Sequence, residues 1–394
     1  MWNAATARKL AWALLALGLV LHAFGVADGW TKVRNADHGR DFASYHYAVH
    51  AAADGLDPYD KAALGKLARE EGTRRAVHPF FYPPPFLLGM SWVLPLTLPQ
   101  AYSAWFWLDS LFLLAVVLAL WKWRPGTGTL LGLAATLAAL SAIPNNHVMG
   151  QANLPTLALM VWGAVLARNR PWLGGALVGV ACMLKMSPAL LVAWWLLRRR
   201  WKPVVSACGA ALVLSLGSLG FGVEVTRTFY LDVLPGFSSG DYNGLTVPVD
   251  LFGNHSLPNL FAQIWPAADG LSSTARTAGS VSSVALLLGS VWLLRDNLAA
   301  VGALCIAMII TPVYAYEHHV TFALVSVVAV ADALWERRLH WGWLALLLPA
   351  FVVMCWPIAQ WKALADGRWL FQEAKFFALL AFGAACVVAS RARA

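Results

Sequence analysis

The residues able to do chemistry lie in a few polar stretches of an otherwise apolar chain, and the first stretch contains Asp41. Asp41 stands in a polar segment, residues 27–85, that follows the first apolar run. Beside aromatic rings at a membrane surface, a carboxylate is partly desolvated and becomes a better base. Asp41 is therefore a candidate proton acceptor. The alternative is a helix cap, since an Asp at the start of a helix accepts backbone N–H bonds and suits the helix dipole.

A lysine, Lys185, lies inside the apolar run Gly174–Leu197, just before Ser187 and Pro188. Charged groups within a membrane are costly, which favours a functional role. Because Pro188 interrupts the helix, the ammonium group can face a cavity on the outer side and bind an anion. The alternative is that the side chain extends to the interface without a ligand.

Uncharged polar groups mark two further places. Gln151 and Asn153 stand between two apolar runs, where amides either satisfy the backbone groups of a helix end or bind a polar ligand such as a sugar. Tyr82 precedes three prolines, residues 83–85, that fix how the chain enters the next helix. The Tyr82 side chain could also line a pocket.

Two later stretches carry candidate anion ligands. Asn254 and Ser256 open a new helix, where free N–H groups favour anions; the alternative is that one of them caps the helix. His318 and His319 begin another apolar run. Adjacent side chains do not point the same way, so this pair alone predicts no zinc site. One imidazole facing a lipid phosphate is the favoured role, and an interfacial polar pair without a ligand is the alternative.

Composition places these residues in a membrane protein. The 394 residues are 59% hydrophobic and 12% charged, whereas soluble domains carry about 25% charged residues, so the chain is expected in a bilayer. The net charge of +9 does not indicate nucleic acid, because the basic residues lie in short clusters between apolar runs, as membrane topology requires. The five cysteines lie in apolar runs without metal-ligand spacing and are expected in the core.

The basic clusters also predict how the chain crosses the membrane. If all of them are cytoplasmic, the apolar runs form about twelve transmembrane helices with both termini inside. The run 84–96 would break this parity and is too short to cross, so it is predicted to be a juxtamembrane or re-entrant helix. The first run also fits a cleaved signal peptide, but the many later runs favour an uncleaved helix. The twelve runs are residues 10–27, 101–121, 130–143, 154–167, 172–184, 188–197, 204–221, 281–294, 301–311, 320–334, 341–356 and 376–388.

A single all-α membrane domain covering the whole chain is therefore expected, with two large extracytoplasmic segments, 27–99 and 222–277. In the first segment, helical spacing of apolar residues predicts an amphipathic helix on the membrane over Asp41–Asp54 and a short helix over Tyr59–Glu71. The second segment is rich in Gly, Pro and Asn and is expected to be loop, with one helix at Pro258–Ile264.

Seven short motifs follow one another between residues 27 and 331. They are Arg40-Asp41-Phe42 with Tyr45, Gly55-Leu56-Asp57-Pro58-Tyr59, Tyr82-Pro83-Pro84, Gly150-Gln151-x-Asn153, Leu184-Lys185-x-x-Pro188, Asn254-x-Ser256, and Thr311-Pro312 followed by His318-His319. In this order and spacing they resemble glycosyltransferase family 87. The resemblance implies a GT-C fold and a mannosyltransferase that uses polyprenyl-phosphate mannose. It also implies a plasma-membrane enzyme with an extracytoplasmic active site.

The resemblance assigns roles to the candidate residues. In GT-C enzymes the catalytic carboxylate lies in the first outer loop, which would make Asp41 the base that takes the acceptor's proton as the anomeric carbon is inverted. Lys185 and either His318 or His319 would stabilise the growing charge of the leaving lipid phosphate. Because phosphate leaves readily, no general acid is needed. No divalent metal cofactor is expected. The sugar and the acceptor would contact Arg40, Tyr45, Tyr82, Gln151, Asn153, Asn254 and Ser256.

The expected partners are the donor lipid, a glycolipid or glycan acceptor and the bilayer, with no nucleic acid. The chain departs from the family pattern at Thr311 and Tyr316, where Ser and Trp are expected, and at His255; these changes leave the acceptor open. Two other functions stay open. A transporter or flippase of lipid-linked sugars would line both halves of a path with polar residues, and a ligase of lipid-linked glycans would need a larger late outer loop.

Overall fold

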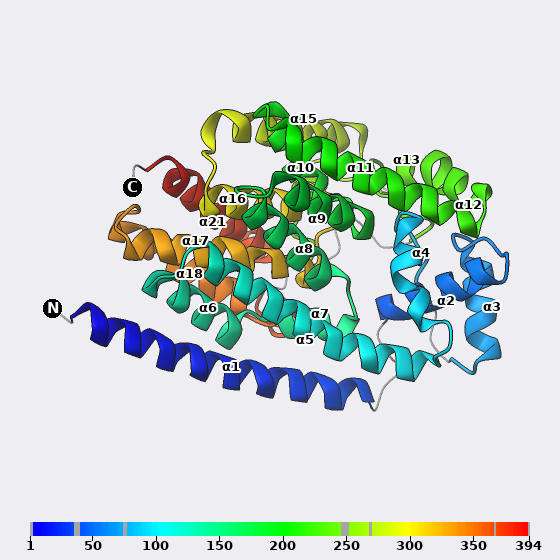
Figure 1. Cartoon of the computed structure of the whole chain (residues 1–394), viewed down its shortest axis with the longest axis horizontal. Helices are drawn as coiled ribbons and strands as arrows, with labels where there is room; N and C mark the ends of the chain where they lie inside the picture. The colour runs from blue at the N-terminus through cyan, green and yellow to red at the C-terminus, as the bar shows by residue number, and fades with distance from the viewer. Residues whose placement is uncertain are drawn as a thin grey trace. The chain divides into compact units, whose positions relative to one another are not determined.

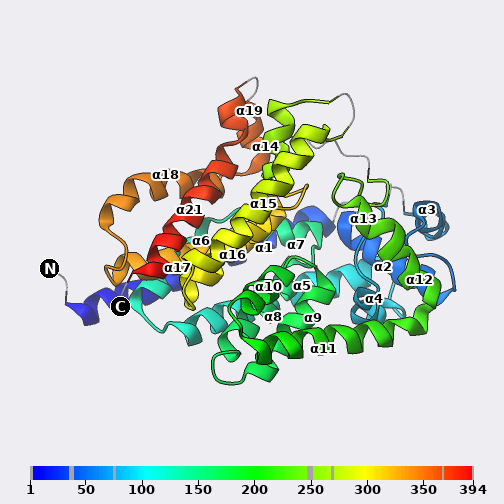
Figure 2. The same cartoon turned by 90° about the horizontal axis from the view of Figure 1, so that it is seen from above.

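The computed structural model describes residues 3–34, 40–73, 77–245, 252–267, 270–365 and 368–392. Within these ranges the chain forms helices joined by turns and loops and has no strand, which confirms the all-α prediction for them (Figures 1 and 2). The chain divides into two compact units. The first unit comprises Met1–Ala27, Val116–Asn145 and Val249–Ala394, and the second comprises Asp28–Ala115 and Asn146–Pro248.

Five of the described helices are long and apolar enough to cross a membrane, and two bent helix pairs could each add one crossing. The five are Ala4–Lys32, Leu98–Trp123, Trp201–Phe221, Glu317–Trp335 and Ala374–Arg391. The bent pairs are Thr127–Ala139 with Ala142–Met149, at 54°, and Trp341–Cys355 with Ile358–Ala365, at 110°. This pattern fits a polytopic membrane protein. Each of the twelve predicted apolar runs overlaps a helix or a helix pair, with bounds that differ by up to eight residues, while the number of crossings stays a prediction.

The second unit carries the polar segment around Asp41 and the helices packed against it. Its helices are α2 (Arg40–Ala53), α3 (Lys61–Glu70), α4 (Pro85–Met90) with η1 (Ser91–Val93), α8 (Asn153–Leu166), α9 (Pro171–Leu184), α10 (Ala189–Leu197), α11 (Trp201–Ser218) with η2 (Leu219–Phe221), α12 (Val223–Thr228), η3 (Phe229–Val233) and α13 (Leu234–Gly236). Three helices have residues in both units: α1 (Ala4–Arg34), α5 (Leu98–Trp123) and α7 (Ala142–Met149).

Helix α9 is the packing centre of the second unit, since it contacts both α8 and α11. Gly175 and Gly179 bring α9 so close to α11 that an added Cβ would lie 2.2 Å from the Pro203 carbonyl oxygen or 2.3 Å from that of Ala207. Small residues of this kind are what membrane helices use to pack, because lipid supplies no hydrophobic force between them. These two glycines therefore determine how closely α9 approaches α11, and with it where the turn after α9 lies.

Helix α2 forms where the sequence predicts it, but its surroundings differ from the expectation. Residues 42–49 are all buried by the protein, including His46 on the face expected to be polar. The expectation of one apolar and one polar face is therefore wrong for residues 42–49, while the position of the helix on the membrane stays a prediction. The reason is aromatic packing: Phe42 contacts Tyr102, and Tyr45 contacts Phe86, with ring centroids 5.6 and 4.8 Å apart.

The three predicted short helices form at their places, whereas the prediction that the rest of segment 222–277 is loop is wrong, because α12, η3 and α13 occupy residues 223–236. Helix α3 lies within the predicted 59–71, and α4 with η1 lies within 84–96. In the first unit, α14 (Leu257–Ile264) matches the predicted Pro258–Ile264 within one residue. Ser256 caps α14 by accepting a hydrogen bond from the backbone N–H of Asn259 at 3.1 Å. Capping residues and first-turn prolines therefore marked these helix starts in the sequence.

In the first unit, the largely buried helix α17 packs against α6, α16 and α21. Near the end of α17, Asp332 accepts hydrogen bonds from Arg124 at 3.1 Å and from Arg338 at 2.5 Å. Besides α1 and α14, the helices of this unit are α6 (Thr127–Ala139), α15 (Ser273–Leu293), α16 (Leu298–Ile310), η4 (Glu317–Phe322), α17 (Ala323–Trp335), η5 (Trp341–Trp343), α18 (Leu344–Cys355), α19 (Ile358–Ala365), α20 (Trp369–Gln372) and α21 (Ala374–Arg391).

We expect Gly179→Ala to destabilise the protein, because the added methyl group would press on the Ala207 backbone; overpacking of this kind costs about 1–3 kcal/mol. Gly209→Ala on α11 is the matched control, since an added Cβ there meets nothing within 4 Å and Ala favours a helix by about 1 kcal/mol over Gly. The thermal midpoint of the purified chain in detergent should fall for the first variant and hold or rise for the second. Equal midpoints would contradict the close approach of α9 and α11.

Candidate active site

Asp41, the candidate base, lies in the first turn of α2 and is held by the side-chain amide of Gln151. Gln151 Nε2 donates a hydrogen bond to Asp41 Oδ2 at 2.7 Å. Gln151 belongs to the turn between α7 and α8, where Gly150 has a φ of 66° and an added Cβ would lie 2.6 Å from the Cβ of Phe42. Glycine alone suits both the backbone angle and the contact, and the turn therefore brings Gln151 against α2.

Two tyrosines fix the orientation of Gln151. The hydroxyl groups of Tyr45 and Tyr82 lie 3.2 and 3.1 Å from Gln151 Oε1 and 2.8 Å from each other. Burial raises the pKa of Tyr45 and that of Tyr82, so both side chains remain neutral phenols that can donate. Because the amide oxygen faces these donors, the amide nitrogen must turn toward Asp41.

A row of asparagines continues from Gln151 to Lys185. Asn146 Nδ2 donates to the backbone oxygen of Gln151 at 3.2 Å, and Asn153 Nδ2 donates to Asn146 Oδ1 at 2.9 Å. Lys185 Nζ donates to Asn153 Oδ1 at 2.6 Å from the turn that follows α9. Hydrogen-bonded groups therefore form an unbroken path from Asp41 to Lys185. Burial lowers the pKa of Lys185 to about 7, and the nearby Asp41 carboxylate opposes this shift.

The second unit thus assembles most of the predicted site, here called the amide cluster. A carboxylate at one end and an ammonium at the other, both half-buried, can accept a proton and hold an anion within one environment. The side chain of Arg40 lies outside the described part of the chain, and its role stays a prediction, as do the roles of the other members. The predicted residues in the cluster are Asp41, Tyr45, Tyr82, Gln151, Asn153 and Lys185.

Sequence reasoning missed two members of the cluster, Asp109 and Asn146. Asp109 on α5 is 0% exposed, and its Oδ2 accepts a hydrogen bond from Asn146 Nδ2 at 2.9 Å. Asn146 in turn contacts both the backbone of Gln151 and the side chain of Asn153. The signal was present in the sequence, because a carboxylate inside a long apolar run is costly unless it serves a purpose.

In the first unit, Asn254 and Ser256 hold the segment that leads to the histidines. Asn254 Nδ2 and Ser256 Oγ each donate to the Val313 carbonyl oxygen at 2.9 Å. The backbone N–H of Ala315 donates to Asn254 Oδ1 at 2.8 Å. Both polar side chains are buried, and the capping alternative for Ser256 is confirmed. Contact with a sugar stays a prediction for both residues.

The two predicted phosphate ligands lie on η4 of the first unit. The rings of His318 and His319 are 4.3 Å apart between centroids. His319 Nδ1 accepts a hydrogen bond from the backbone N–H of Tyr316 at 3.0 Å, so this ring is oriented by its own turn. His318 is buried and His319 is half-buried. Within the described ranges no three His, Cys, Asp or Glu side chains are grouped as a metal site requires; independence of metal stays a prediction.

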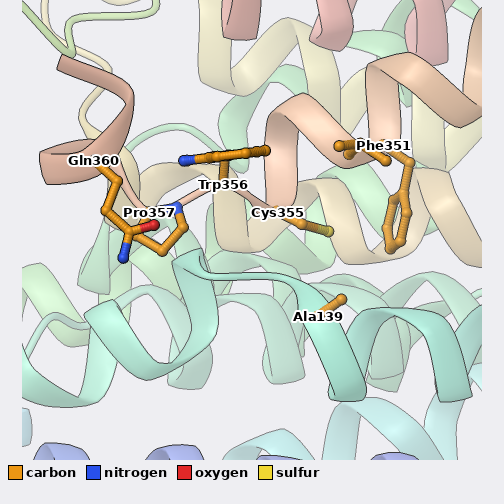
Figure 3. Close-up of a pocket in the computed structure, with 7 residues that line it drawn as sticks. Ala139, Phe351, Cys355, Trp356, Pro357 and Gln360 are labelled. Carbon is orange, nitrogen blue, oxygen red and sulfur yellow. The ribbon is translucent and has the colours of Figure 1, made fainter. Parts of the chain in front are cut away.

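The first unit also contains an apolar pocket of about 390 Å³ at the bend between α18 and α19 (Figure 3). The predicted site residues do not line it. Its lining suits a hydrocarbon chain better than a sugar, because it offers few polar groups. The lining residues are Ala139, Phe351, Val352, Cys355, Trp356, Pro357 and Gln360.

Comparison with known proteins decides the family. The sequence model of glycosyltransferase family 87 matches residues 80–315. The chain belongs to glycosyltransferase family 87. This confirms the resemblance drawn from the seven motifs. The matched region contains Gln151, Asn153 and Lys185 of the amide cluster, whereas Asp41 precedes it and His318 follows it.

Several relatives of this family 87 chain are named for the reaction they catalyse. One is the polyprenol-phosphate-mannose-dependent alpha-(1-2)-phosphatidylinositol mannoside mannosyltransferase of Mycolicibacterium smegmatis, 26% identical over 386 residues, which cover 87% of this chain and 83% of the relative. Another is the corresponding phosphatidylinositol pentamannoside mannosyltransferase of Mycobacterium tuberculosis, 25% identical over 84% of this chain and 76% of the relative. No solved structure gives a significant match.

The stability of the protein should depend on pH through His46 of α2. Burial and then the neighbouring His50 lower the pKa of His46 from 6.5 to about 4; the half-exposed Glu71 carboxylate, 3.8 Å away, does not offset the burial. Because the folded-state pKa is below the unfolded one, the unfolded chain binds the proton more readily between these values. The stabilisation is complete above about pH 6.5 and is lost progressively as the pH falls toward 4.

We therefore expect acidification from pH 7 to pH 5 to lower the free energy of unfolding by about 2 kcal/mol through this group. Thermal unfolding in detergent at the two pH values measures the effect. His46→Gln should flatten the pH dependence, and His78→Gln, at a half-exposed position, should leave it unchanged. An unaltered slope in the His46 variant would show that another group carries the pH dependence.

Proposed function

We propose that this chain transfers mannose from polyprenyl-phosphate mannose to a hydroxyl group of a glycolipid, as an inverting GT-C enzyme of the plasma membrane. The relatives named above depend on that donor and act on phosphatidylinositol mannosides. The observation that carries the proposal is the hydrogen-bonded path from Asp41 to Lys185. It supports a site in which one bound sugar phosphate meets a base at one end and a cation at the other.

In the proposed reaction, Asp41 accepts the proton of the acceptor hydroxyl while that oxygen forms a bond to the anomeric carbon. The bond from the anomeric carbon to the phosphate oxygen breaks, and its electron pair leaves with polyprenyl phosphate. Gln151 keeps the Asp41 carboxylate in one orientation, which limits the loss of entropy on reaching the reactive geometry. The acceptor attacks from the face opposite the phosphate, so the configuration is inverted.

The leaving phosphate gains negative charge as the bond breaks, and fixed positive charge is the most effective stabilisation of such a transition state. Lys185, placed by its hydrogen bond to Asn153, supplies this charge. His318 or His319 adds a second contact to the phosphate. Asn254 and Ser256 act by holding segment 313–315, which leads to both histidines.

The membrane arrangement proposed with this function has about twelve crossings, both termini in the cytoplasm and the reaction on the outer face. The apolar pocket at the α18–α19 bend is a place where part of a lipid chain can lie. The departures from the family pattern at His255, Thr311 and Tyr316 leave open which mannosylated lipid is the acceptor.

Asp41→Asn is expected to reduce mannose transfer by about 100-fold or more, because loss of a general base costs roughly 10²–10⁴-fold. Membranes that contain the variant or the wild type are supplied with radiolabelled polyprenyl-phosphate mannose and phosphatidylinositol mannosides, and labelled product is counted. Asp54→Asn removes an exposed carboxylate just beyond the same helix and should retain full activity. Full transfer by Asp41→Asn would refute the assignment of the base.

Lys185→Met is expected to raise KM for the donor by about tenfold, since the hydrogen bond to a charged group contributes about 1.5–3 kcal/mol, and to lower kcat, because the phosphate gains charge in the transition state. KM for the acceptor should change little. Lys202→Met, which removes an exposed lysine of the same unit, serves as the control and should match the wild type. Donor kinetics measured at saturating acceptor separate the two cases, and an unchanged donor KM with an unchanged kcat in Lys185→Met would remove Lys185 from the phosphate site.

A further inference from the structure

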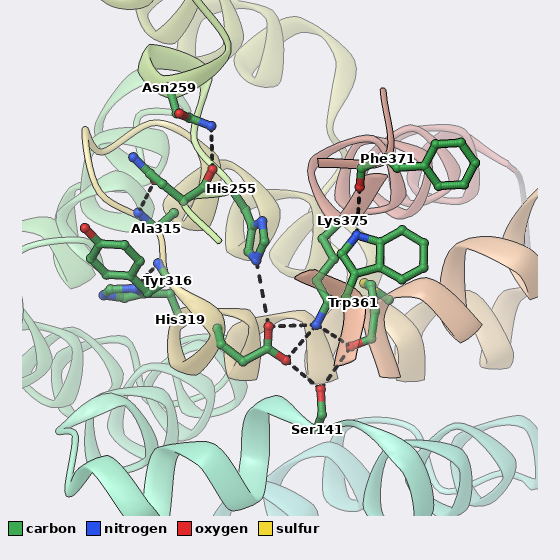
Figure 4. A network of polar contacts seen from close by, with 12 residues as sticks. Ser141, His255, Asn259, Ala315, Tyr316, His319, Trp361, Phe371 and Lys375 are labelled. Atoms are coloured by element: carbon green, nitrogen blue, oxygen red, sulfur yellow. Dashed lines mark hydrogen bonds and ion pairs between the residues drawn. The ribbon is translucent and has the colours of Figure 1, made fainter. Parts of the chain in front are cut away.

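A buried ion pair lies beside the two histidines, and neither of its members belongs to the amide cluster. Lys375, in the first turn of α21, is 0% exposed, and its Nζ donates to both carboxylate oxygens of Glu317 at 2.7 Å (Figure 4). Glu317 is the first residue of η4 and directly precedes His318. Ser141 Oγ also donates a hydrogen bond to Glu317 Oε1 at 2.5 Å, so the carboxylate is held by both Lys375 and Ser141.

The pair joins four separate parts of the first unit. Glu317 comes from η4, Lys375 from α21, and Ser141 from the break between α6 and α7. The fourth is the end of α18, where the Met354 carbonyl oxygen accepts from Lys375 Nζ at 3.4 Å and from Ser141 Oγ at 3.3 Å. Lys375 and Ser141 act directly on Glu317, the residue next to His318. Their contacts with Met354 tie the same groups to α18. Together these contacts fix where η4 begins.

A second set of contacts from the same turn of α21 reaches the other end of this segment. Glu373 precedes α21, and its Oε1 accepts a hydrogen bond from Asn259 Nδ2 at 2.9 Å. The same Nδ2 donates to the backbone oxygen of Asn254 at 2.6 Å, and Asn254 is bonded to Val313 and Ala315. Residues 313–319, here called the histidine segment, are therefore linked to the start of α21 in two places. Lys375 bonds directly to Glu317, and Glu373 is connected through Asn259 and Asn254 to residues 313 and 315.

Stability alone does not account for a buried ion pair. Removing two charges from water costs about as much as their attraction returns, and apolar residues of similar size often replace such a pair without loss. Charges within apolar helices are costly for the same reason. The buried imidazole of His255 also faces this carboxylate, with Nε2 3.7 Å from Glu317 Oε2. We therefore expect this ion pair to fix the position of the neighbouring histidine segment.

We propose that Glu317 and Lys375 are positioning residues that hold the histidine segment in the conformation in which an imidazole contacts the donor phosphate. The inference rests on the proposed function and extends it to the last helix, which carries none of the seven motifs. Lys375 and Glu317 act through the backbone of η4 and do not themselves touch the substrate. Loss of the pair therefore impairs use of the donor more than use of the acceptor.

Four variants of the full chain in detergent test the proposal. Lys375→Met breaks the pair, Glu317→Met with Lys375→Met removes both charges, and Lys375→Arg keeps the pair. Asp332→Asn is the matched control, since it weakens the ionic contact of Asp332 with Arg124 and Arg338. Asp332 lies near the end of α17, which continues η4, roughly 20 Å from Glu317 along the helix axis. Donor and acceptor kinetics, thermal midpoints and hydrogen exchange at residues 313–319 are measured for each.

Misplacement of a ligand by about 1 Å can cost about 100-fold in rate, and a loss of up to that size in kcat/KM for the donor is expected in Lys375→Met. The double variant should regain the thermal midpoint but not donor use, and Lys375→Arg should regain both. Exchange at residues 313–319 should quicken by about tenfold or more in Lys375→Met and in the double variant. Asp332→Asn should lower only the midpoint.

Two results would overturn the proposal. One is a double variant that recovers donor use together with stability, since the pair would then be replaceable packing. The other is unchanged exchange at residues 313–319 in Lys375→Met. The exchange measurement needs no substrate, so it remains decisive even if the wild type transfers no mannose, an outcome that would refute the proposed function instead.

Discussion

The hydrogen bond from Gln151 to Asp41 is the contact on which the polar chemistry of the second unit depends. In surroundings this apolar, a hydrogen bond is electrostatically stronger than in water, and an unpaired group is correspondingly expensive. The Gln151 amide satisfies the two tyrosines with its oxygen and Asp41 with its nitrogen, so one side chain orients three others. Its backbone oxygen then continues the path to Asn146 and, through Asn153, to Lys185.

Helix packing places the two ends of that path. Lys185 ends α9, and α9 is pressed against α11 through glycines that leave no room for side chains. Gly150 positions Gln151 in the same way, because its positive φ and its contact with Phe42 bring the turn that contains Gln151 against α2. The positions of an acid and a lysine far apart in the sequence are therefore set by residues without side chains.

Each unit gives its buried carboxylate and lysine side chains hydrogen-bond partners. In the second unit, Asp109 receives a hydrogen bond from Asn146, and Lys185 is bonded to Asn153. In the first unit, Glu317 is bonded to Lys375 through both oxygens. Isolated charges in apolar surroundings are disfavoured by many kcal/mol. These contacts therefore fix the position of each helix along its axis, which apolar packing alone does not determine.

The sequence by itself determined the helical class, the short helices at α3, α4 and α14, and the family; it did not predict α12, η3 and α13. Apolar runs are read directly from composition, and Ser256 or the prolines before α4 mark helix starts because their backbone chemistry is local. The order of the motifs was enough to identify glycosyltransferase family 87, which the family match confirmed. Asp41, Gln151 and Lys185 were chosen as site residues from their chemistry in an apolar context.

The tertiary structure decided which of these residues touch. No local pattern reveals that Gln151 turns its nitrogen to Asp41, or that Asn146 and Asp109 complete the row, because these contacts join residues 37 to 110 positions apart. The burial of both faces of α2 and the bond from Lys375 to Glu317 are likewise products of packing between distant helices. Periodicity predicts that a helix forms, but the partners of its polar side chains depend on which other helices surround it.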